Sequence, residues 1–160
     1  MQTTPINGSG HPITRILLAA GYGLLLLGSA VGNSAAQSEP LAPAVFYQEL
    51  GGKDGVAAIS AEFVTLMLAD QRVASTFEGV DLERLRLRLA QQLCQVSGGQ
   101  CAYAGRSMAE SHEDMKITNT QFNASVEHLR LAMDHHNVPS RVQNRLLARL
   151  AVMQRDIVTK

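Results

Sequence analysis

Apolar residues recur at helical spacing through most of the chain after residue 43, and no segment alternates apolar and polar residues as a strand would. Residues three or four apart share one face of a helix, so each apolar stripe must be buried against another element. The first two long stripes predict helices over residues 54–69 and 81–97. Their positions are Val56, Ile59, Phe63, Leu66 and Met67 in the first helix, and Leu82, Leu85, Leu89, Leu93 and Val96 in the second. The pattern predicts an all-α domain.

Two more stripes follow towards the C-terminus. One helix is expected to start at residue 118 or 119 and to end at Asn137-Val138-Pro139, and the next to run over residues 140–157. Long amphipathic helices joined by a short turn pack antiparallel to hide their stripes. Two such pairs stacked on each other would enclose a space. The stripe positions are Phe122, Val126, Leu129 and Met133, then Val142, Leu146, Leu150, Met153 and Ile157.

Polar caps and glycines mark the expected helix ends. We predict that Asp54, Asp81 and Ser140 cap the helices that follow them, because their side-chain oxygens can accept hydrogen bonds from the free N–H groups of a first turn. Gly98-Gly99 is expected to end the second long helix, since a left-handed helix terminus favours glycine. Shorter helical elements are expected at residues 44–50, 73–77 and 107–115.

The first 36 residues differ from the rest in composition. Arg15 precedes an uncharged apolar stretch over residues 16–31, and the small residues Ser34-Ala35-Ala36 come shortly after it. This order is typical of a secretory signal peptide with its cleavage site. We therefore expect a signal peptide over residues 1–36, a linker over 37–43 and one domain over 44–160.

An uncleaved membrane anchor is the alternative interpretation of residues 16–31. The sixteen residues of this stretch are fewer than the roughly 20 that span a bilayer comfortably, which favours cleavage. The expected location is periplasmic or otherwise exported; the alternative is a domain anchored to the membrane by residues 16–31.

The charges of the chain balance, with 14 Lys and Arg against 14 Asp and Glu. This balance argues against a nucleic-acid partner and against a polybasic membrane-binding surface. Membrane contact is expected only through the N-terminal segment, if that segment stays attached.

Cys94 and Cys101 flank the Gly98-Gly99 turn and would close a loop of eight residues. A disulfide between them suits an oxidising compartment. The alternative is two unpaired thiols that pack as small hydrophobic side chains.

One histidine, His112, lies between the apolar residues Met108 and Met115 in the short element at 107–115. A neutral imidazole that faces an apolar slot can supply the axial bond of a five-coordinate haem. A packed or solvated histidine is the alternative. The chain has no CxxCH haem-attachment motif, so a haem here would be held non-covalently.

Several motifs together resemble one family. They are FYQELGGKDGV, FVTLMLADQRVASTFEGVDLERLR, GGQCAYAGRSMAESHEDMKIT, NVPSRV and the closing RDIV. From about Val45 to Val158 the chain is similar to the group I truncated haemoglobins, the short two-over-two globins of bacteria, algae and ciliates. The resemblance implies a two-over-two helical sandwich around haem b.

The same resemblance implies roles for particular residues. His112 would be the proximal ligand of the haem iron, and Phe77 the ring that wedges the haem in place. Arg88 and Arg106 would face the haem propionates, although both could equally be ordinary solvated charges. The full set expected to bind the cofactor is His112, Phe77, Phe63, Val64, Leu85, Arg88, Leu89, Arg106 and Met108.

The chain departs from the family pattern on the distal side. Relatives commonly place a Tyr after the Phe of the second helix and Gln or His on the third, whereas this chain has Val64, Leu85 and Leu89 there. None of these side chains can donate a hydrogen bond. We expect rapid oxygen release and a weaker preference for oxygen over carbon monoxide. Met67 could approach the iron, but a methionine in a helix stripe usually fills the core.

The expected function is reversible binding of a diatomic gas, namely oxygen, nitric oxide or carbon monoxide, at a His-ligated haem iron. One alternative is a nitric oxide dioxygenase or another haem-dependent detoxifying enzyme, which would need an external reductase. A further alternative is a haem-free helical interaction module in which His112 is merely packed.

Overall fold

The computed structural model describes residues 42–160, so the predictions for the signal peptide and for most of the linker lie outside the described residues. The described part is helical, with no strand and one isolated parallel bridge between Ile117 and Val158. The all-α prediction is confirmed. The elements are α1 (Pro43–Glu49), α2 (Gly52–Ala69), the 3₁₀ helix η1 (Ala74–Phe77), α3 (Leu82–Ser97), α4 (Met108–Ser111), α5 (Asn119–His135), α6 (Ser140–Ala151) and α7 (Gln154–Ile157).

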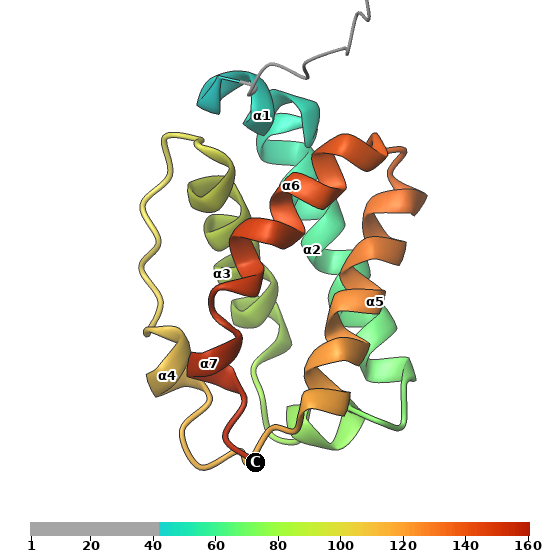
Figure 1. The fold of residues 1–160 in the computed structure, drawn as a ribbon, viewed down its shortest axis with the longest axis vertical. Coiled ribbons are helices and arrows are strands. Elements are labelled where there is room, and N and C mark those ends of the chain that lie inside the picture. The colour runs from blue at the N-terminus through green and yellow to red at the C-terminus, as the bar shows by residue number, and fades with distance from the viewer. Residues whose placement is uncertain (1–41) are drawn as a thin grey trace, which may run out of the picture. The chain divides into compact units, whose positions relative to one another are not determined.

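The helices form two antiparallel pairs (Figure 1). α2 descends and α3 returns beside it, while α5 ascends and α6 runs back across the front of α2. α2 packs against both α3 and α5, and α6 contacts α3 as well as α5. The four long helices therefore surround an interior, as the stripes predict. No helix within residues 42–160 is long and apolar enough to cross a membrane.

Two apolar clusters pack this interior. The larger is built around fully buried side chains of α1, α2, α5 and α6, including Phe46, Ile59, Met133 and Leu146. The smaller contains Met67, Val73 and Ala124, with Phe63 and Phe77 packed against it. The clusters hold the helices together without closing the space between them.

Two of the three predicted N-caps are wrong. Asp81 does cap α3, since its carboxylate accepts a hydrogen bond from the Arg84 N–H at 3.1 Å. α2 instead starts at Gly52, because Gly51 adopts a left-handed φ of 84° and brings Gly55 against the Leu50 carbonyl, where a Cβ would clash. Asp54 consequently lies inside the first turn. The N-cap of α6 is Pro139, so Ser140 is the first residue inside the helix, and no side chain caps this end.

Two predicted helices are also shorter than expected. The element at 107–115 is reduced to α4, because Asp114 and Lys116 adopt positive φ values of 62° and 54° and turn the chain away. The helix expected over 140–157 is divided into α6 and α7. α7 continues the apolar face, which is why the stripe concealed the break.

The structure joins Cys94 and Cys101 in a disulfide, with 6.0 Å between their Cα atoms. The bond links the end of α3 to the loop that leads to α4. Gly98 ends α3 with a φ of 90°, as predicted for this turn. The loop is therefore tied to the core at a single covalent point.

Replacing both cysteines by serine should lower the free energy of unfolding by about 2.5 kcal/mol, the entropy of closing an eight-residue loop. Urea unfolding with and without dithiothreitol measures the effect. The reductant should destabilise the native chain and leave the Cys94→Ser/Cys101→Ser variant unchanged. Equal stability of the two chains under oxidising conditions would contradict the prediction.

Candidate functional site

A cavity of about 590 Å³ lies between the two helix pairs. Its volume is within the range of roughly 300–1,000 Å³ typical of cofactor and ligand sites. Aliphatic and aromatic side chains form most of the wall. All nine residues expected to bind the cofactor line this one cavity: Phe63, Val64, Phe77, Leu85, Arg88, Leu89, Arg106, Met108 and His112.

His112 lies at the C-terminal end of α4, a helix of four residues. A helix this short is unstable alone and needs its ends fixed. A capping box does so: the Ser107 hydroxyl accepts from the Glu110 N–H at 3.2 Å, and the Glu110 carboxylate accepts from the Ser107 N–H at 2.8 Å. Hydrogen bonds from Ser107 lower the pKa of Glu110. The charged carboxylate therefore helps to fix the turn that carries His112.

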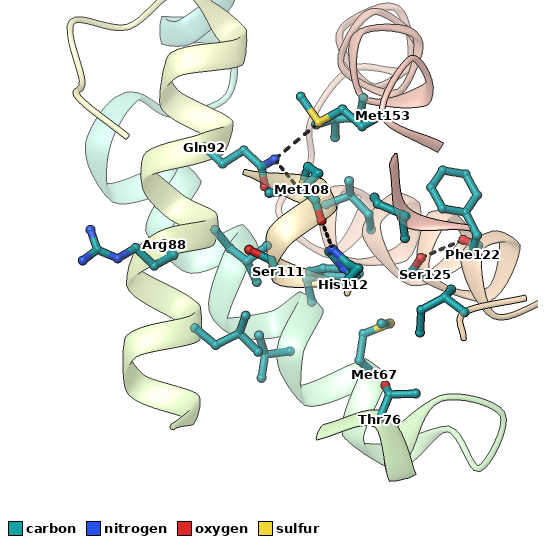
Figure 2. A pocket seen from close by; sticks show the side chains of 18 of the residues that line it. Met67, Thr76, Arg88, Gln92, Met108, Ser111, His112, Phe122, Ser125 and Met153 are labelled. Carbon is teal, nitrogen blue, oxygen red and sulfur yellow. Dashed lines mark hydrogen bonds between the residues drawn. The ribbon is translucent and has the colours of Figure 1, made fainter. Parts of the chain in front are cut away.

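The His112 ring is oriented by the backbone of its own turn. Its Nδ1 lies 2.8 Å from the carbonyl oxygen of Met108, and a dashed line marks this contact in Figure 2. A carbonyl oxygen can only accept, so Nδ1 carries the proton and donates it. Nε2 then holds the free lone pair that a metal requires. No side chain or backbone group in the described part of the chain hydrogen-bonds Nε2.

The α2 and α3 sides of the cavity are aliphatic at three positions. Val64 is buried, and Leu85 and Leu89 are partly buried on the facing side of α3. These walls exclude water and offer no hydrogen-bond donor. Phe77 lies at the end of η1 and reaches both the cavity and the smaller apolar cluster.

A charged network fixes the turn that leads to η1. The Asp70 carboxylate accepts hydrogen bonds from the Arg72 N–H and Nε, both at 2.8 Å, and from His128 Nε2 at 2.7 Å. Arg72 also donates to Glu127 at 2.9 Å. The hydrogen bonds from Arg72, followed by that from His128, hold the pKa of Asp70 far below its usual range. The network ties the end of α2, and the turn that carries Phe77, to α5.

The two arginines expected to face propionates direct their head groups outwards. Arg88 donates to Gln91 at 2.8 Å, and in Figure 2 its guanidinium points away from His112. The Arg106 side chain is 66 % exposed and lies 3.9 Å from Glu113. Both residues therefore border the cavity with their stems and carry their charge at its edge.

Sequence reasoning missed several residues of the cavity wall. Gln92 donates through Nε2 to the sulfur of Met108 at 3.3 Å and to that of Met153 at 3.4 Å. Tyr103 donates its hydroxyl proton to the Arg106 carbonyl at 2.9 Å. Gln92 follows Leu85 and Leu89 at helical spacing, a signal that could have placed it on the cavity face.

This set of groups fits a haem. The cavity has apolar walls for the macrocycle, a single imidazole with a free lone pair, and two arginines at its edge. Residues 42–160 hold no group of three or more His, Cys, Asp or Glu side chains that could bind a bare metal ion. A metal bound at His112 would therefore need most of its ligands from a cofactor.

The family model described as bacterial-like globin matches residues 45–159. The chain belongs to the bacterial-like globin family. It is 28 % identical over 118 residues to the group 1 truncated hemoglobin of Tetrahymena pyriformis, covering 74 % of this chain and 98 % of that protein. It is 31 % identical over 100 residues to the protein of the same name from Tetrahymena thermophila, covering 62 % and 82 %. The predicted resemblance is confirmed.

Solved structures agree with the family. The Fe(III) form of the Tetrahymena pyriformis truncated hemoglobin matches with a TM-score of 0.69 and 28 % identity, covering 72 % of this chain and 98 % of that one. The 2/2 hemoglobin from Synechococcus, in its cyanomet state with covalently attached heme, matches with a TM-score of 0.66 and 26 % identity, covering 72 % and 98 %. The predicted truncated-globin fold is also confirmed, and the family implies haem binding.

Asp70→Asn should lower the free energy of unfolding near pH 7, because the amide cannot replace the charged acceptor of Arg72 and His128. The folded pKa of Asp70 is depressed, so its contribution is complete above the unfolded value of about 3.9 and is lost as pH falls below it. Urea unfolding at several pH values measures the difference between the two chains.

Glu113→Gln, a change at a carboxylate that is 70 % exposed, is the control and should have little effect at any pH. A deficit of Asp70→Asn that persists undiminished in strong acid would show that the carboxylate's charge is not responsible.

Proposed function

We propose that this chain reversibly binds a diatomic gas through haem b, held non-covalently with His112 Nε2 as the proximal ligand. Oxygen is the first candidate, with nitric oxide and carbon monoxide as the others. The observation that carries the proposal is the His112 ring, whose Nδ1 is committed to the Met108 carbonyl and whose Nε2 is free. When bound, the haem would supply the iron to which the gas binds.

The proximal side of the site is prepared by the fold. The Met108 carbonyl sets both the tautomer and the orientation of the imidazole before any cofactor arrives. The capping box at Ser107 and Glu110 holds the short helix that supplies this carbonyl. Little rearrangement is then needed for Nε2 to ligate iron.

The distal side determines how the gas is held. A partly anionic oxygen ligand would find Val64, Leu85 and Leu89 and no donor among them. The missing hydrogen bond is worth about 1.5–3 kcal/mol when one partner carries charge. We therefore propose that oxygen leaves this site rapidly and that the preference for oxygen over carbon monoxide is weak.

The edge of the cavity suits the remaining parts of the cofactor. Arg88 and Arg106 would pair with the propionates, which requires their head groups to turn from Gln91 and Glu113. We propose non-covalent attachment because the chain has no CxxCH motif. The covalently attached heme named for the Synechococcus protein belongs to that relative.

Gas binding is favoured over enzymatic detoxification by the character of the distal wall. Splitting an O–O bond benefits from a positioned acid–base group, and Val64, Leu85 and Leu89 supply none. A nitric oxide dioxygenase would use the same cavity together with an external reductase. Formation of nitrate when the oxygenated ferrous protein meets nitric oxide would favour that alternative.

Val64→Tyr should slow oxygen release by roughly 10- to 150-fold, the equivalent of one hydrogen bond to a charged partner. The hydroxyl would provide a donor where the native chain has an aliphatic side chain. Val64→Phe is the matched control, because it adds the same ring without the hydroxyl. Stopped-flow displacement of oxygen by carbon monoxide measures the rate in each haem-loaded chain.

Carbon monoxide release should change less in Val64→Tyr than oxygen release, because a less anionic ligand gains less from a donor. Equal slowing by tyrosine and phenylalanine would attribute the effect to bulk and contradict the account of the distal side. A native chain that takes up no hemin would instead support the haem-free module.

We further propose that the domain works after export. The disulfide between Cys94 and Cys101 supports an oxidising compartment, and residues 1–36 have the composition of a signal peptide. Intact-mass measurement of the protein from its native source should give a chain starting near Gln37. A mature chain that starts at Met1 would contradict cleavage and favour the membrane anchor over residues 16–31.

A further inference from the structure

One side-chain amide in the cavity wall contacts two sulfurs. Gln92 Nε2, on α3, lies 3.3 Å from Met108 Sδ on α4 and 3.4 Å from Met153 Sδ, which precedes α7. Figure 2 shows the amide directed at both thioethers. All three side chains are partly buried and line the cavity. Three segments therefore meet at one N–H₂ group and two sulfur atoms.

These are unusual partners for an amide donor. A thioether sulfur is a weak acceptor, so the amide gains little from it in the resting protein. A sulfoxide oxygen on the same methionine would be a strong, polar acceptor. The amide is thus placed to donate a hydrogen bond to a sulfoxide oxygen, which the reduced methionines do not carry.

The other methionines of the cavity lack this arrangement. Met67 and Met115 also line the wall, yet no side-chain donor in residues 42–160 hydrogen-bonds their sulfurs. Met115 is 36 % exposed, and Met67 is 7 % exposed. Comparing these methionines with Met108 and Met153 therefore separates the effect of solvent exposure on the sulfur from the effect of a nearby hydrogen-bond donor.

We propose that Met108 and Met153 form a peroxide-reactive site in which Gln92 supplies the hydrogen-bond donor. The oxidant is hydrogen peroxide or a small alkyl hydroperoxide that enters the cavity. A sulfur lone pair attacks one peroxide oxygen, the S–O bond forms and the O–O bond breaks. With hydrogen peroxide the departing oxygen takes the proton of the transferred oxygen and leaves as water. The sulfur loses two electrons, the peroxide gains them, and the product is methionine sulfoxide.

Gln92 assists this step at two points. Negative charge develops on the departing oxygen as the O–O bond breaks, and an amide N–H beside the sulfur can donate to it. After the transfer, the same N–H donates to the sulfoxide oxygen. Methionine sulfoxide can be reduced enzymatically, so the modification is reversible.

The site is coupled to the axial histidine through Met108. The backbone carbonyl of this residue holds His112 Nδ1, and its side chain carries one of the two sulfurs. A polar oxygen on that sulfur would alter the packing of α4 against α3 and the α6–α7 junction. The inference concerns the sulfurs themselves and does not depend on gas binding.

The test is peptide mapping of the haem-loaded full chain after brief exposure to hydrogen peroxide. Cyanide is added so that peroxide does not react at the iron, and catalase ends the exposure. Mass spectrometry then gives the sulfoxide fraction at positions 67, 108, 115, 133 and 153. We expect Met108 or Met153 to be oxidised faster than Met115, despite the greater exposure of Met115. Met133, which is fully buried, should be oxidised least.

Gln92→Glu removes the N–H donors while keeping the size of the side chain, and Gln92→Leu removes the polar group. Both should slow oxidation at positions 108 and 153 by about two- to tenfold relative to Met115 in the same sample, the rate equivalent of one neutral hydrogen bond. Gln95→Glu, at an exposed position on the same helix, is the matched control and should behave as the native chain.

Oxidation that follows exposure, with Met115 first and with no effect of either Gln92 variant, would overturn the proposal. A chain that takes up no haem would defeat the proposed function instead, and the same peptide map would still decide the present inference.

Discussion

The hydrogen bond from His112 Nδ1 to the Met108 carbonyl is the interaction on which the site depends. It spans 2.8 Å within a single turn and leaves Nε2 as the free nitrogen of the ring. Without it, the neutral imidazole could present either nitrogen, and the nitrogen proposed to ligate the haem iron would not be defined. The capping box at Ser107 and Glu110 matters for the same reason, because it holds the four-residue helix that supplies the carbonyl.

The rest of the fold keeps a largely apolar cavity beside this ring. Two apolar clusters pack the helices against one another, and residues of both clusters help to line a cavity of about 590 Å³. The disulfide restrains the loop before α4, and the Asp70 network restrains the turn before Phe77. The segments that carry His112 and Phe77 are thus each restrained just after a long helix, by the disulfide after α3 and by the Asp70 network after α2. Under the proposed function, Val64, Leu85 and Leu89 would offer a bound gas no hydrogen-bond donor.

Local patterns predicted the long helices, since a stripe at helical spacing shows which side chains share a face. The set of nine candidate residues came from the family resemblance, and the structure brings all nine to one cavity. The capping of α3 by Asp81 was also predictable, because it involves residues only three apart. The proposed caps at Asp54 and Ser140 failed because the backbone at Gly51 and Pro139 sets where those helices start. An apolar stripe also cannot reveal a helix break when the next helix continues the same apolar face. The division between α6 and α7 was missed for this reason.

Contacts between distant segments could not be predicted in this way. His128 meets Asp70 across 58 residues, and Gln92 meets Met153 across 61. Each pair depends on how two helices pack, and a single sequence does not define that packing. The contact between Gln92 and Met153 therefore became apparent only from the structure.

The identity of the axial donor is the most direct test of the account. Resonance Raman spectra of the ferrous, haem-loaded protein should show an iron–imidazole stretching band in the native chain. The band should be absent from His112→Gly and return when free imidazole is added to that variant. A band that persists in His112→Gly without added imidazole would show that another residue ligates the iron, and would contradict the assignment of His112.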